Sequence, residues 1–143
     1  MEPIVVEFEV AASVGTAFRL WTEGCSNWWP PSHSMSAGEA FQVVFEPRAG
    51  GRIYEVGDDG DEYPWGRVTV WEPPTRLEYS WHIFLDETMA TTVSVTFSES
   101  PRGSRVRLVN DGFEVFGDEA GRERAGRVGS AWEMIVGNYR NAI

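Results

Sequence analysis

The spacing of the acidic residues and histidines in this sequence singles out one candidate for acid–base chemistry. Glu55 closes the segment GGRIYE. A carboxylate buried without a cationic partner has a raised pKa and can serve as a general acid or base. Two orientations are open for Glu55: inward, beside Asn110, or outward, as a solvated charge at the edge of a sheet. Glu55 is therefore the one catalytic candidate that the sequence offers, and it is a weak one.

The sequence offers weaker candidates for a nucleophile or a metal site than for a general acid or base. The sequence has two histidines and one cysteine. His33 falls in a Pro/Ser-rich loop, and strand alternation places His82 on an outward face, so these residues do not form a metal triad with ordinary geometry. No base at suitable spacing activates Cys25, which we expect to be a small buried hydrophobe. The DDGD segment at 58–61 lacks the EF-hand pattern and predicts a hairpin turn. We expect no metal and no cofactor.

Composition excludes several classes of function. The chain has 143 residues, a net charge of −10 and 12 basic residues, all of them arginine. Without lysine there is no Schiff-base or pyridoxal phosphate chemistry, and the negative charge would repel a phosphate backbone. No apolar run approaches the roughly 20 residues of a membrane span. With one cysteine and an amino terminus unlike a signal peptide, we expect a cytoplasmic protein without nucleic-acid or membrane partners.

Hydrophobic periodicity indicates the elements that position these residues. Residues 4–10 alternate as a strand, Ser13 can cap a short helix that stops at Gly24, and one further turn and a loop follow. Residues 40–110 read as six strands joined by tight turns. Beyond residue 117 the period becomes helical, with Asp118 as a plausible cap. The apolar face of this predicted C-terminal helix consists of Val128, Trp132, Ile135, Val136, Tyr139 and Ile143. We predict one α+β domain over residues 1–143: a seven-stranded, twisted antiparallel sheet wrapped around a long C-terminal helix, with two short helices between strands 1 and 2.

Aromatic side chains dominate the face of the sheet that alternation turns inward. Tyr79 and Trp81 from the sheet, with Trp132 and Tyr139 from the helix, carry polar tips that need partners when buried. The other inward residues expected are Val68, Val70, Leu77, Ile83, Val93, Val95, Phe97, Val106, Leu108 and Asn110. An apolar surface with a few convergent polar atoms is typical of a small-molecule pocket, although dense packing between helix and sheet would explain the same residues.

Four segments also give the chain a resemblance to a known family: AFRLWTEGCSNWWPPSHS, FEPRAGGRIYE, WGRVTVWEPPTRLEYSW and GSRVRLVNDGF. Over nearly its whole length it resembles the activator of Hsp-90 ATPase homologue-like (AHSA-type) proteins of the START and birch-pollen-allergen-like (SRPBCC) superfamily. The resemblance implies the helix-grip fold, which serves ligand carriers, cyclases and co-chaperone domains alike. The family often has histidine where this chain has Asn110, so the expected pocket loses a titratable group. Ala131 replaces a common glycine, a minor change.

The leading hypothesis is a binder of a small apolar, ring-containing ligand, held between helix and sheet. Of the adjacent Trp28 and Trp29, we expect one ring to cap the core and the other to roof the pocket mouth. The expected wall residues are Trp28, Phe45, Tyr79, Trp81, Phe97, Asn110, Phe113, Trp132, Val136 and Tyr139. Two alternatives stay open. One is an interaction module for an Hsp-90-type chaperone, or for a second copy of the chain as a homodimer. The other is a small cyclase- or hydrolase-like enzyme that uses Glu55.

Overall fold

A seven-stranded antiparallel sheet forms the body of the structure, which is a computed structural model describing residues 1–38 and 40–143. Its strands are β1 (Ile4–Val10), β2 (Phe41–Phe45), β3 (Arg52–Gly57), β4 (Glu62–Glu72), β5 (Arg76–Trp81), β6 (Thr91–Ser100) and β7 (Gly103–Asp111). The strand order is β1-β7-β6-β5-β4-β3-β2, so six strands form a meander and β1 pairs with its last strand. The predicted sheet and fold class are confirmed.

Six helical segments accompany the sheet: α1 (Val14–Thr22), η1 (Cys25–Asn27), η2 (Pro31–His33), η3 (Glu87–Met89), η4 (Phe113–Phe116) and α2 (Asp118–Asn141). The predicted cap of α1 is confirmed, because the Ser13 hydroxyl accepts a hydrogen bond from the Thr16 N–H at 3.2 Å. The expected cap of α2 is wrong. Gly117 holds that position with a φ of 88°, and Asp118 is the first helical residue.

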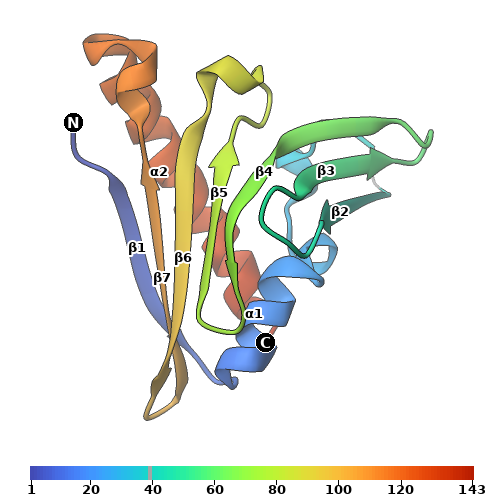
Figure 1. Cartoon of the computed structure of the whole chain (residues 1–143), viewed down its shortest axis with the longest axis vertical. Helices are drawn as coiled ribbons and strands as arrows, with labels where there is room; N and C mark the ends of the chain where they lie inside the picture. The colour runs from blue at the N-terminus through green and yellow to red at the C-terminus, as the bar shows by residue number, and fades with distance from the viewer. Residues whose placement is uncertain (39) are drawn as a thin grey trace.

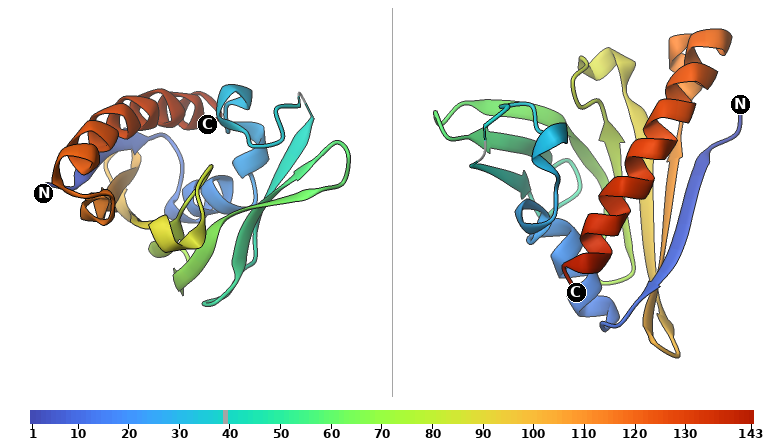
Figure 2. Two further views of the ribbon diagram at one scale, coloured as in Figure 1. Left: turned by 90° about the horizontal axis from the view of Figure 1, so that it is seen from above. Right: turned by 180° about the vertical axis from the view of Figure 1, so that it is seen from behind.

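The long helix α2 lies across the concave side of the curved sheet (Figure 1, Figure 2). Its buried stripe is Trp132, Ile135, Val136 and Tyr139, as the periodicity predicts. The last expected member is wrong: Ile143 lies beyond the end of the helix and is 41% exposed. None of the helices in the described ranges is long and apolar enough to cross a membrane.

Alternation fails at one point in β4. The register with β5 shifts between Val68 and Val70, which is the signature of a bulge. Val70, expected inside, therefore leaves the core face. Trp71 turns inward instead and packs edge-on against Phe18 at 5.2 Å.

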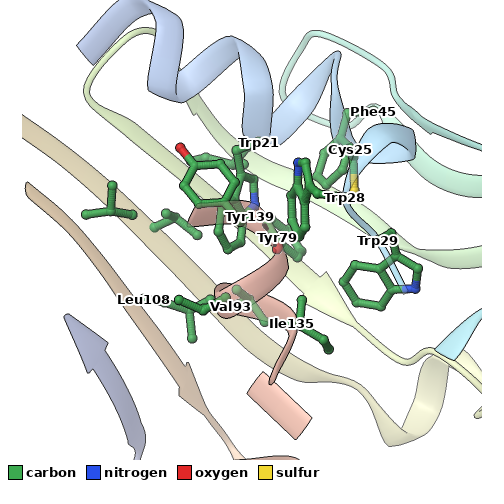
Figure 3. Packing of buried hydrophobic residues seen from close by; sticks show 14 of the residues in the cluster. Trp21, Cys25, Trp28, Trp29, Phe45, Tyr79, Val93, Leu108, Ile135 and Tyr139 are labelled. Carbon is green, nitrogen blue, oxygen red and sulfur yellow. Dashed lines mark hydrogen bonds between the residues drawn. The ribbon is translucent and has the colours of Figure 1, made fainter. Parts of the chain in front are cut away.

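Aromatic residues form a close group beside α1. Trp21, Trp28, Tyr79 and Tyr139 gather there in one group, with Trp29 set apart from them (Figure 3). Their rings lie at edge-on or tilted angles, with centroids 4.9 Å apart for Trp21 and Trp28 and 5.2 Å apart for Trp28 and Tyr139. Such contacts stabilise a packed interior beyond the burial of area alone. This end of the molecule is therefore filled by its own aromatic side chains.

Candidate functional site

An apolar pocket of about 140 Å³ lies where the β5–β6 connection, η4 and the middle of α2 meet. This end of the sheet is opposite to the end that α1 covers (Figure 1). Residues from the η1–η2 region complete the wall. The lining residues are Trp29, His33, Trp81, His82, Ile83, Phe84, Leu85, Thr91, Asn110, Phe113, Phe116, Arg124, Val128, Ala131, Trp132 and Ile135.

Three tryptophans bound the pocket where it meets the core. The ring centroids of Trp81 and Trp132 are 6.0 Å apart, and Trp29 lies 5.7 Å from Trp81 and 6.2 Å from Trp132. Trp29 and Trp132 present their rings nearly at right angles, at 82°. Flat aromatic surfaces at such angles suit a planar ring that packs against one wall and meets another with its edge.

Asn110 places a polar group in this apolar wall, and its own hydrogen bonds fix its orientation. The amide Nδ2 donates to the Thr91 hydroxyl at 2.9 Å and to the Thr92 carbonyl at 3.0 Å. The Oδ1 atom accepts from the indole N–H of Trp132 at 3.0 Å. Asn110 thus satisfies the buried indole of Trp132, and one lone pair of its Oδ1 stays free of protein hydrogen bonds among the described residues.

His82 corrects an expectation, because it is 8% exposed and lines the pocket. Strand β5 ends at Trp81, and residues 82–85 form a turn closed by a 2.7 Å bond from the Leu85 N–H to the His82 carbonyl. Alternation therefore no longer applies at His82. Its Nδ1 lies 3.2 Å from the Leu85 carbonyl oxygen. Since a carbonyl only accepts, Nδ1 carries the proton, and Nε2 is the nitrogen left for a ligand.

Two further basic residues, neither of them predicted from the sequence as a wall residue, line the pocket. The His33 ring stands next to Ser32, with Nδ1 and Oγ 2.9 Å apart. Arg124 holds its guanidinium 4.9 Å from the centre of the Phe116 ring. Burial, followed by the neighbouring charge of Arg127, lowers the pKa of Arg124 from its usual range. Helical periodicity was the available signal, because Arg124 stands one turn before Val128 on the buried stripe.

Of the ten expected wall residues, the structure brings four to this pocket: Trp81, Asn110, Phe113 and Trp132. The other six lie in the core cluster instead: Trp28, Phe45, Tyr79, Phe97, Val136 and Tyr139. There the Tyr79 hydroxyl accepts from the Trp21 indole at 3.4 Å, and the Tyr139 hydroxyl donates to the Ala17 carbonyl at 2.7 Å. Burial raises the pKa of both phenols. Of the adjacent tryptophans, Trp28 packs in the core and Trp29 lines the pocket.

Glu55 takes the inward orientation of the two left open, and it is fully buried. Its carboxylate accepts the backbone N–H groups of Met35 at 2.7 Å and Ser36 at 2.8 Å. Three strands separate its strand, β3, from β7, so it does not lie beside Asn110. The carboxylate anchors the segment between η2 and β2 and is outside the pocket lining.

Cys25 is buried, as expected, and burial raises the pKa of its thiol. Among residues 1–38 and 40–143, no three His, Cys, Asp or Glu side chains group closely enough to hold a metal ion. The DDGD segment forms the turn between β3 and β4.

Comparison with known proteins places this pocket in a family context. A family model described as activator of Hsp90 ATPase homolog 1-like protein matches residues 11–138. A search of curated proteins returned no match.

Solved structures share the fold over almost the whole chain. An anthrahydroquino-γ-pyrone synthase, Txn09, is 30% identical with a TM-score of 0.68, covering 100% of this chain and 97% of that one. Protein MLL2253 from Mesorhizobium loti is 20% identical with a TM-score of 0.73, covering 98% and 95%. The Aha1 dimer from Colwellia psychrerythraea is 15% identical with a TM-score of 0.72, covering 99% and 96%.

Proposed function

This chain belongs to the family of activator of Hsp90 ATPase homolog 1-like proteins, and from that premise we propose that it binds a small, ring-containing ligand in the pocket between the β5–β6 connection, η4 and α2. The observation that carries the proposal is the pocket itself: a hollow with aromatic and aliphatic walls and a few fixed polar atoms.

The size of the pocket favours a single ring at its inner end. A cavity of about 150 Å³ with apolar walls holds one benzene molecule, and this pocket measures about 140 Å³. Burying about 150 Å² of apolar area at 25 cal/mol per Å² gives roughly 4 kcal/mol, or a dissociation constant near 1 mM. A larger ligand would place further rings at the mouth, beside Phe84 and Phe116, and bind more tightly.

The relationship with Txn09 supports the same class of ligand. That protein is an anthrahydroquino-γ-pyrone synthase, and its name describes a fused-ring aromatic product. At 30% identity over the full length, a ring-binding role is the one we carry over to this chain. The reaction is not carried over, because fold and pocket alone do not determine chemistry.

Titration with toluene tests the proposal. The indole N–H signals of Trp29, Trp81 and Trp132 are followed by nuclear magnetic resonance, and we expect saturable shifts with a dissociation constant near 1 mM. Ala131→Phe fills the pocket from α2 and should abolish them, whereas Ala120→Phe, at an exposed position of the same helix, should not. Equal titration curves for the two variants would contradict the proposal.

The second candidate, a partner role towards an Hsp90-type ATPase or a second copy of this chain, has narrower support. It rests on the description of the family and on the fold shared with the Colwellia dimer. A homodimer would show in the sedimentation velocity of the purified chain, and chaperone binding would show as a change in the ATPase rate of an added Hsp90. A cytoplasmic location remains a prediction from the sequence.

A further inference from the structure

The ionisable side chains of the pocket lining are basic, whereas the chain as a whole is acidic. Acidic residues number 22 against 12 basic ones, yet no Asp or Glu stands among the described lining residues. The ionisable side chains present are Arg124, His33 and His82. In a protein with a net charge of −10, this reversal at one hollow indicates an acidic ligand.

Resting on the proposed function, we infer that the pocket selects rings that carry an acidic hydroxyl group, a phenol or an enol, with His82 accepting the hydroxyl proton and Arg124 facing the oxygen that remains. His82 suits this role because the Leu85 carbonyl holds its Nδ1–H and leaves Nε2 as an acceptor. Among the described residues, Nε2 makes no hydrogen bond to the protein.

The proton transfer is balanced within the pocket. The O–H bond of the ligand breaks and an N–H bond forms at Nε2 of His82. The products are a phenolate and an imidazolium that still donates its Nδ1–H to Leu85. No other reactant is required. Apolar surroundings disfavour the separation of charge, so the ionised pair depends on a further cation beside the phenolate oxygen, and Arg124 is the group placed to supply it.

Arg124 is placed to stabilise the phenolate. In the described part of the chain no carboxylate lies within 4 Å of its guanidinium, unlike the paired Arg52, Arg76 and Arg105 on the outer face of the sheet. Contact with the Phe116 ring holds it at the pocket wall. Burial already disfavours this cation, so an anionic ligand would supply the partner that it lacks.

Other charged groups surround His82, and each enters the energetics. Asp86 follows on the same turn and interacts with it electrostatically. On the other side of the sheet, a groove that His82 also lines carries Arg52, Glu62, Arg67, Asp86 and Glu87. On that side, the positive charges of Arg52 and Arg67 are offset by the carboxylates of the groove. The uncompensated positive charge is thus on the pocket side, at Arg124.

A matched pair of probes tests the inference. 4-Nitrophenol and 4-nitrotoluene differ by a hydroxyl in place of a methyl group of similar size. We expect the phenol to bind at least tenfold more tightly in the same titration, because its hydroxyl gains a bond to a group that becomes charged. At pH 6, where free 4-nitrophenol is mostly protonated, the bound probe should show the absorption band of the phenolate.

Three variants assign the effect to residues. His82→Asn keeps a donor near the Nδ1 position and removes Nε2, and Arg124→Gln removes the charge. Each should reduce the preference for the phenol and the phenolate band, whereas Arg122→Gln, at an exposed position outside the lining, should preserve both. Equal affinity for the two probes, or a preference that survives in His82→Asn, would overturn the inference and leave the proposed function standing. If neither probe saturates and Ala131→Phe changes nothing, both fail.

Discussion

Replacing Tyr139 by phenylalanine tests whether the aromatic group beside α1 is a dry core or the wall of a water-filled cavity. The Tyr139 and Tyr79 side chains are at most 1% exposed, and burial raises the pKa of both phenols. A phenol whose folded pKa is raised keeps its proton while the unfolded chain loses one. Its contribution to stability is therefore fully present below the unfolded pKa, near 10, and is lost as the pH rises towards the folded value.

The magnitude follows from the linkage relation. Between pH 10 and pH 11, each protected phenol lowers the free energy of unfolding by about 1 kcal/mol, approaching 1.4 kcal/mol per further pH unit. The two phenols together account for about 2 kcal/mol of the loss in the wild type. Tyr139→Phe should remove half of that loss. Its cost at pH 7 should be modest, because helix α1 offers the Ala17 carbonyl a second donor, the Trp21 N–H.

The assay is urea unfolding at pH 9, 10, 10.5 and 11, with the free energy of unfolding plotted against pH. Tyr54→Phe is the matched control, because that ring is only partly buried. The slope of Tyr139→Phe should be shallower than wild type by about 1 kcal/mol per pH unit, and the control should keep the wild-type slope. Parallel curves for all three proteins would refute the reasoning. They would indicate that the Tyr139 hydroxyl lies in a water-filled cavity.

Three further predictions concern the sheet, the thiol and the pocket wall. Gly66→Ala would place a Cβ 1.8 Å from the Ser80 carbonyl oxygen and should cost more than about 3 kcal/mol in urea unfolding, whereas Gly126→Ala, with open space around it, should add about 0.5 to 1 kcal/mol. Cys25 should react with iodoacetamide far more slowly in the folded protein than in urea, since burial raises its pKa and keeps it protonated; equal rates would contradict its placement. Asn110→Leu should lower the free energy of unfolding by about 2 to 4 kcal/mol, because it leaves the Trp132 indole and the Thr92 carbonyl unpaired; a loss below 1 kcal/mol would argue against these bonds.

Strand alternation predicted the fold and much of the core, because inside regular strands each side chain's face follows from position alone. It placed Tyr79, Trp81 and Asn110 inward correctly. It failed where regularity ends. The bulge at Val68 and Val70 depends on pairing with β5, which no local pattern in β4 reveals.

The pocket was harder to predict than the core, because half of its lining residues come from the connections between the strands and α2. His82 lines both the pocket and the groove on the outer side of the sheet, because β5 stops one residue earlier. Phe84 takes a positive φ of 66° that its residue type does not suggest. Helical periodicity places Arg124 on the same face of α2 as Val128, but a charged residue is ordinarily assigned to the solvent side. Asn110 was found by alternation, but the absence of histidine there did not leave the pocket without titratable groups.

Substitutions among the aromatic residues should have different effects at the two ends of the sheet. Beside α1, the Trp21 indole donates to the Tyr79 hydroxyl and the Tyr139 hydroxyl donates to the Ala17 carbonyl, so substitutions there change stability first. At the other end, β5 stops at Trp81 and β6 begins at Thr91, and residues 124–135 of α2 face the β5–β6 connection and η4 as well as the ends of strands. Residues 82–90 and 112–117 can therefore change in shape and charge without disturbing the sheet register. In this chain those connections, with α2, bring His82 and Arg124 to the hollow, and the selectivity for an acidic ring that we propose depends on that end of the fold.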